Sequence, residues 1–181
     1  FGHAPKEIQT APAVGRIQIV GTPPDEGSVL TITSTAGTTK TYVFMDDGID
    51  STGDLDGGSV VVQTDGVSGV GNIAAELQTA INDTNGHNGG SANSVISISR
   101  TDGVLTLTQV VHGSTGNQAI TYAEGTPSHV QVQGFSGGQD AIESANCLWY
   151  NQRAERTIPA LNTGVTSVNA DRQTILDRAT T

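Results

Sequence analysis

The stretch SVLTITSTAGTTKTYVFM (28–45) decides the fold class of this chain. Apolar and polar residues alternate through 29–33, which is the two-residue period of a strand with one buried face. A short segment around a glycine interrupts the pattern, and alternation resumes over 40–45, where Tyr42 and Phe44 share a face. Two alternating runs on either side of a Gly-containing turn predict a β-hairpin.

Working outward, the same two-residue period recurs along most of the chain. It predicts further strands at 16–20, 59–64, 95–100, 104–109, 119–122 and 130–133. The third and fourth of these flank a Thr-Asp-Gly turn, so we expect a second hairpin there.

One segment has a helical period instead. Ile73, Leu77 and Ile81 recur every fourth residue and form one apolar stripe, and Asn72 is the expected N-cap. Strands on both sides of a single helix predict an α+β fold, with a mainly antiparallel β-sheet domain and one packed helix.

Composition and charge exclude two classes of partner. The 181 residues include 23 Gly, are 35% hydrophobic and only 4% aromatic, and carry 8 basic against 18 acidic side chains, for a net charge of −10. A chain with two lysines and no basic stripe is not expected to bind nucleic acid or an anionic membrane surface. No run approaches the roughly 20 apolar residues of a membrane-spanning helix.

The charge is distributed unevenly, and this predicts three parts. Residues 1–138 hold 4 basic and 13 acidic residues, whereas 139–181 hold 4 basic and 5 acidic residues and lose the alternating pattern. We therefore expect an N-terminal extension (1–13), a β-rich domain (14–138) and a C-terminal helical and extended arm (139–181). Because the chain begins with Phe rather than Met, we expect a processed or excised piece of a longer protein.

The C-terminal arm contains the predicted interface. Asp140 as N-cap, with Glu143 three residues on, is a capping box for a helix that we expect to run to about Arg156. Aromatic and arginine side chains contribute most to protein interfaces, and the candidates in this helix are Trp149, Tyr150, Arg153 and Arg156. The alternative is that this helix only covers the sheet of its own domain.

An acidic segment, DDGIDSTGDLDGG (46–58), is the candidate metal site. Calcium takes six to eight oxygen ligands from flexible loops, and Asp50, Asp54 and Asp56 are the candidate ligands. The segment lacks the EF-hand pattern. The alternative is a solvated acidic loop that protects a neighbouring edge strand from aggregation.

Catalytic motifs do not stand out in the sequence. The four histidines lack metal-ligand spacing, no G-x-S-x-G elbow is present, and Cys147 is the single cysteine, so neither a disulfide framework nor a nucleophile is indicated. We therefore expect a protein that is not an enzyme and needs no cofactor, calcium aside. A pair of carboxylates brought together by the fold stays open.

The pattern as a whole resembles a β-rich module of tailed-bacteriophage virion structural proteins. The resemblance covers roughly residues 16–123 and is carried by GTPPDEGSVLTITSTAGTTKTYVF (21–44), NIAAELQTAIN (72–82) and GVLTLTQVVHGSTGNQAI (103–120). It implies a non-enzymatic building block of a capsid or tail, located in the virion, with other virion proteins and copies of itself as partners. It transfers no catalytic residues.

Two functions from different classes follow. The first is the virion structural protein, assembling through subunit contacts. The second is an extracellular calcium-dependent adhesion or carbohydrate-binding module with a host-surface glycan as partner, for which a ring must stack on the sugar. The candidate rings are Tyr42, Tyr122, Trp149 and Tyr150.

Overall fold

Strands make up most of the fold, which is taken from a computed structural model that describes residues 10–21, 23–124 and 129–141. These residues belong to one compact unit, Gln9–Ala141. The elements are β1 (Val14–Ile19), β2 (Val29–Thr33), β3 (Thr39–Met45), β4 (Leu55–Asp56), β5 (Ser59–Gln63), α1 (Val70–Asn82), β6 (Ile96–Thr101), β7 (Val104–Gln109), the 3-10 helix η1 (Ser114–Gly116), β8 (Ile120–Ala123) and β9 (Val130–Ser136).

The strands form two sheets, and the α+β class with mainly antiparallel pairing is confirmed. One sheet has the order β6-β7-β1-β9, and the other β4-β5-β3-β2-β8. All pairs are antiparallel except β3 with β5. The predicted hairpin over 28–45 is formed by β2 and β3, which pair from Val29–Val43 to Thr33–Thr39.

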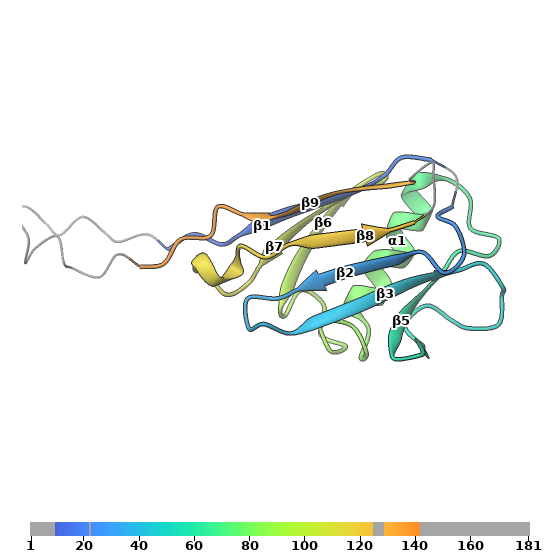
Figure 1. Cartoon of the computed structure of the whole chain (residues 1–181), viewed down its shortest axis with the longest axis horizontal. Helices are drawn as coiled ribbons and strands as arrows, with labels where there is room; N and C mark the ends of the chain where they lie inside the picture. Colours follow the sequence, from blue (N-terminus) through green and yellow to red (C-terminus); the bar gives the residue numbers. More distant parts are fainter. Residues whose placement is uncertain (1–9, 22, 125–128, 142–181) are drawn as a thin grey trace, which may run out of the picture. The chain divides into compact units, whose positions relative to one another are not determined.

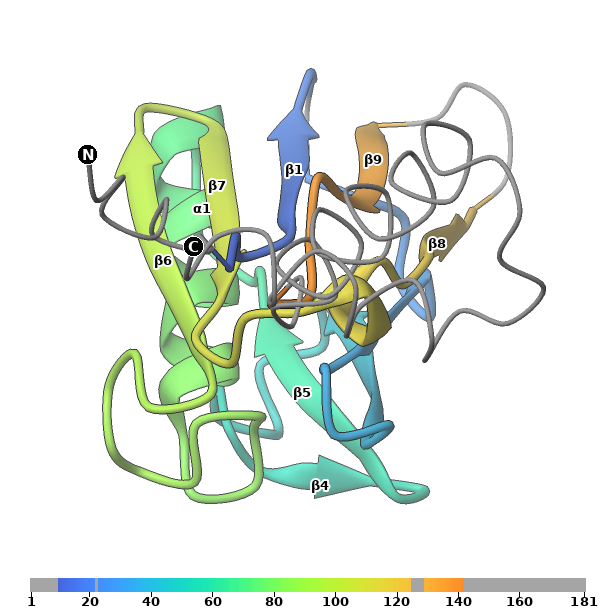
Figure 2. The ribbon, with the colours of Figure 1, turned by 90° about the vertical axis from the view of Figure 1, so that its left-hand side faces the viewer.

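The core lies between the sheets and the helix. The apolar stripe of α1 is fully buried at Ile73, Leu77 and Ile81. The helix contacts β5 of one sheet and β1, β6 and β7 of the other, on the side of the domain away from β8 and β9 (Figure 2). At the opposite side the sheets approach each other, where the N–H of Phe135 donates to the carbonyl of Gln118.

The predicted N-cap of the helix is wrong. The helix begins at Val70, and Gly69 takes the N-cap position with φ 87°, a conformation that favours glycine. Asn72 lies in the first turn, and its Nδ2 donates to the carbonyl of Ser68 at 2.8 Å. The side chain therefore satisfies a carbonyl before the helix, whereas an N-cap side chain accepts from a helix N–H.

The acidic segment forms half of a hairpin that the alternation pattern did not predict. Leu55 of β4 pairs with Val60, and Asp56 pairs with Ser59, around a turn at Gly57 and Gly58. A two-residue strand is too short for a recognisable period. The segment also connects β3 to its parallel neighbour β5. Parallel strands need a longer crossover connection than the tight turn of a hairpin.

The two ends of the sheets define two poles (Figure 1). We call the end at which β1 begins and β9 ends the exit pole, and the opposite end the far pole. At the exit pole, the N–H of Ala11 donates to the carbonyl of Gln139 at 3.1 Å, and the N–H of Gln139 donates back at 3.0 Å. Ala13 is fully buried, and the Asp140 carboxylate accepts hydrogen bonds from the N–H and hydroxyl of Ser114. Residues that precede and follow the predicted domain 14–138 in the sequence thus pack against it.

The far pole is the opposite end of the same domain. It contains the loops that follow β1, β3, β5, β6 and β8. These loops contact one another: the N–H of Ile19 donates to the carbonyl of Gly103, and that of Val20 donates to the carbonyl of His129. In the described part of the chain no helix is long and apolar enough to cross a membrane.

Candidate functional site

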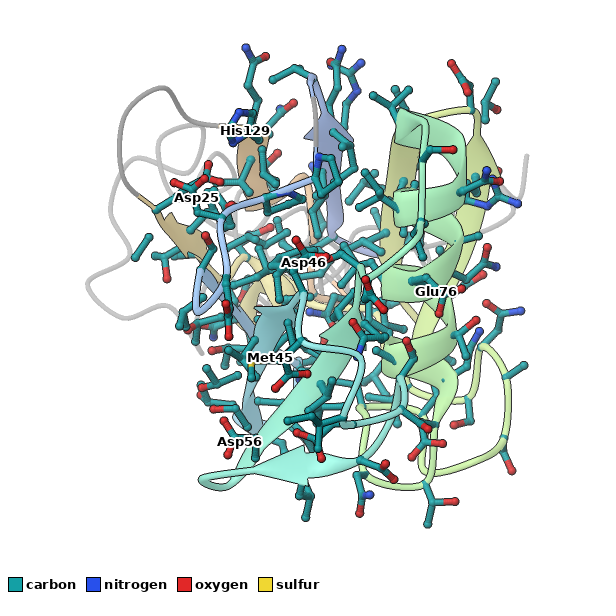
Figure 3. All side chains as sticks on the ribbon, turned by 90° about the vertical axis from the view of Figure 1, so that its right-hand side faces the viewer. Asp25, Met45, Asp46, Asp56, Glu76 and His129 are labelled. Carbon is teal, nitrogen blue, oxygen red and sulfur yellow. The ribbon has the colours of Figure 1, made fainter. Side chains whose placement is uncertain are left out.

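Carboxylates gather at the far pole, which Figure 3 views face on. Every loop there contributes at least one: Asp25 and Glu26, Asp46 and Asp47, Asp65, Asp102, and Glu124. All but Glu124 are exposed. The far pole therefore has a negative potential that attracts cations and repels acidic surfaces.

The predicted calcium ligands do not converge. A carboxylate oxygen of Asp54 accepts the N–H of Ser51 at 3.0 Å, so it serves a local turn. Asp56 is exposed in β4, and the backbone carbonyl of Asp50 accepts a hydrogen bond from Nε2 of Gln63. Strand pairing spreads the three residues along the β4–β5 hairpin instead of wrapping them around one point.

A different set does converge, from two segments far apart in the sequence: the one between β1 and β2 and the one between β8 and β9. Asp25 follows β1, Glu124 follows β8, and His129 precedes β9. One potential ligand atom of each lies within 4.8 Å of the other two, and within the described residues this is the one group of three such side chains. Figure 3 shows Asp25 and His129 close together and well away from Asp56.

Glu124 holds the group together. Its Oε1 accepts the N–H of Asp25 at 2.8 Å, and Oε2 accepts the N–H of His129 at 2.5 Å. The imidazole Nδ1 of His129 lies 2.8 Å from Oε1. Burial raises the pKa of Glu124, but the hydrogen bonds from His129 and Asp25 outweigh it and hold the pKa at about 2.

The neighbours of Glu124 include two buried hydroxyls. Ser28 and Tyr122 lie beside each other, and Tyr122 is also close to Glu124 and Asp25. Neither hydroxyl makes a hydrogen bond of normal length and angle with a described residue, although Tyr122 lies close enough to Ser28 and Glu124 for both to affect the pKa of Tyr122. Burial raises the pKa of Tyr122, which keeps the hydroxyl protonated. Spacing in the sequence does not reveal this cluster, because Asp25 and Ser28 meet Tyr122, Glu124 and His129 only through sheet topology.

A second polar pair is buried in the core. The hydroxyl of Tyr42 lies 2.7 Å from Nδ1 of His87, and Nε2 of His87 faces the carbonyl of Thr38 at 3.3 Å. A carbonyl only accepts, so Nε2 carries the proton and Nδ1 accepts from Tyr42. The pKa of His87 is lowered to about 4, because burial and, to a smaller extent, the charge of Lys40 lower it more than the hydrogen bond to Thr38 raises it. This neutral pair fixes the loop after α1 to β3.

The two candidate sugar-binding rings that the structure describes do not form an open platform. Tyr42 is fully buried, and Tyr122 is half-buried, with Phe44 edge-on at 6.1 Å. A cavity of about 290 Å³ lies near β3 and β5, lined by Thr39, Lys40, Thr41, Leu55, Gly58, Val60 and Asn85. No aromatic ring is among these described lining residues, so the cavity offers no stacking surface for a sugar.

The predicted interface lies outside the described residues, as do the other aromatic candidates. This applies to Trp149, Tyr150, Arg153 and Arg156. Comparison with known proteins finds no family model that matches the chain and no matching curated protein.

Proposed function

We propose that the chain is a non-enzymatic structural component of a bacteriophage virion, in a capsid or tail. The β domain is displayed, and the arm 139–181 makes contacts with copies of itself and with other virion proteins. The likeness of residues 16–123 to virion modules supports this proposal.

The observation that carries the proposal is the position of the two ends of the domain. Thr10 and Ala141 leave the same pole, next to the paired Ala11 and Gln139. A domain whose two ends lie at one pole can be attached there and display its opposite pole. Attachments at opposite ends would instead suit a domain embedded in line within a rod.

The surface chemistry agrees with display. The loops of the far pole, opposite the attachment, carry exposed carboxylates, and a net negative charge keeps neighbouring copies apart. Repeated weak contacts can still hold an assembly together, because many copies act at once. Assembly then adds to the stability of a small domain.

The test is the oligomeric state of the full chain and of residues 10–141, measured by light scattering after size-exclusion chromatography over a concentration series. The shorter chain retains the pairing of Ala11 with Gln139 and of Asp140 with Ser114. We expect defined oligomers from the full chain and folded monomers from the shorter one. Monomers from both would contradict self-assembly through the arm and favour the adhesion module.

A substitution sharpens the test. Trp149→Ala is expected to weaken assembly of the full chain more than it lowers the melting temperature, with Arg172→Ala as a control elsewhere in the arm. Equal losses of assembly and stability would mean that the arm only covers its own domain.

A further inference from the structure

We propose that Asp25, Glu124 and His129 form a binding site for a divalent transition-metal ion such as zinc at the far pole. Their ligand atoms lie within 4.8 Å of one another. Ligand atoms around one zinc ion lie within about 4 Å of one another, since each lies about 2 Å from the metal, and a side-chain rotation of the exposed Asp25 covers the remaining difference. The proposal does not depend on the virion setting.

The donor set selects the class of metal. One imidazole nitrogen with two carboxylate oxygens suits zinc and related first-row ions. Calcium and magnesium prefer oxygen ligands throughout. Three protein ligands leave room for water or for a group from a partner, as in sites with an open coordination position.

The site is already oriented without the metal. The N–H groups of Asp25 and His129 hold the two oxygens of Glu124, so the carboxylate has one fixed direction. Nδ1 of His129 points at Oε1 from 2.8 Å. A metal ion takes the place of the proton between these two atoms, and the ring then carries its proton on Nε2.

The two unpartnered hydroxyls are an independent indication of a ligand. Ser28 is only 4% exposed, yet its Oγ has no hydrogen-bond partner among the described residues, and neither has the buried Tyr122 hydroxyl beside it. A buried hydroxyl without a partner costs free energy. Water bound to a metal between Asp25 and Glu124 supplies a partner at this point, in the manner of outer-shell groups around metal sites.

The carboxylate of Asp25 distinguishes a metal site from a cluster that only holds the loops together. Its N–H and carbonyl are used, by Glu124 and Ser28 respectively, but its exposed carboxylate makes no hydrogen bond within the described residues. A cluster that only fastened the loops would not need this carboxylate, so removing its charge would leave such a cluster unchanged. A metal gives the carboxylate a role.

The experiment is a calorimetric titration of the full chain with zinc chloride, together with melting temperatures with and without zinc. We expect Asp25→Asn and His129→Ala to weaken zinc binding at least about tenfold, since even outer-shell losses cost that much. Asp25→Asn should melt like the wild type without zinc. Asp102→Asn and His112→Ala are matched controls that should bind zinc as the wild type does.

Three outcomes overturn the proposal. The wild type does not bind zinc, or Asp25→Asn and His129→Ala bind it with unchanged affinity, or binding is lost only in Cys147→Ser. Cobalt gives a second readout, because a thiolate ligand produces a different absorption spectrum from nitrogen and oxygen ligands. We expect the cobalt spectrum of Cys147→Ser to equal that of the wild type.

Discussion

Residues 46–58 and 83–95 are both irregular, polar and glycine-containing, but they differ in where their side chains lie. In the first segment the carboxylates of Asp46, Asp47, Asp54 and Asp56 are exposed. In the second, the centre formed by residues 86–88 is buried. The segment with five aspartates is thus a surface loop, and the segment with one aspartate and several neutral polar residues forms part of the core.

The cause of the difference is whether the polar atoms find partners inside the domain. Asn88, only 2% exposed, donates to Asn82 and to the carbonyl of Ile96, and its Oδ1 accepts from the N–H groups of Val95 and Ile96. Neutral groups that are fully bonded can be buried at low cost, whereas carboxylates without a cation stay in water.

The largest effect is expected from breaking this network. Asn88→Ala removes four hydrogen bonds and leaves the buried N–H of Ile96 without its partner, so we expect a loss of about 3–5 kcal/mol in the free energy of unfolding. Urea denaturation measures it. Asn72→Ala, which removes one exposed hydrogen bond to Ser68, should cost about 1 kcal/mol or less. Equal losses would contradict the role of Asn88.

The next effect concerns pH. The pKa of His87 is about 4 in the folded chain and 6.5 in the unfolded chain, so only the unfolded chain takes up a proton between these values. Stability is complete above pH 6.5 and declines as the pH falls toward 4, by up to about 3 kcal/mol.

The control for this pH dependence is His87→Gln, which removes the titrating group. Melting temperatures between pH 6.5 and 5 should fall in the wild type more steeply than in the variant. This window lies above the range in which Glu124 contributes, because its pKa moves from 4.5 to about 2 on folding. Parallel curves for the two proteins would mean that the pKa of His87 is the same in the folded and unfolded chains, which would contradict a ring held neutral by burial.

The sequence predicts elements better than it predicts sites, because elements follow local patterns whereas the site depends on long-range contacts. The alternation over 28–45 and the stripe of Ile73, Leu77 and Ile81 are local patterns, and both elements form as expected. The parallel neighbours β3 and β5 are joined through long-range pairing. The cluster of Asp25, Glu124 and His129 depends on the loop before β2 meeting the loop between β8 and β9. Glu124 and His129 are five residues apart, but their contact with Asp25, 99 residues away, leaves no trace in residue spacing.

A smaller effect is expected where the two segments touch. Gly53 has φ 98°, and an added Cβ would lie 2.5 Å from the Asp83 carboxylate. Its carbonyl also accepts from Nδ2 of Asn85. Gly53→Ala should therefore destabilise the domain by about 2 kcal/mol, measured by urea denaturation. Gly57→Ala, with φ 54° and open space around it, is the matched control and should cost about 1 kcal/mol.

The smallest effect is expected at the exposed carboxylates of the β4–β5 hairpin. Asp56 is exposed and makes no side-chain hydrogen bond within the described residues, so Asp56→Asn should change the free energy of unfolding by less than about 0.5 kcal/mol. Asp54→Ala also removes the bond to Ser51 and should cost about 1 kcal/mol. Because these carboxylates do not converge, millimolar calcium should leave the melting temperatures of both variants and the wild type unchanged. A calcium-dependent rise in the wild type that Asp54→Ala abolishes would instead establish this hairpin as the cation site, since a bound ion stabilises only the folded chain.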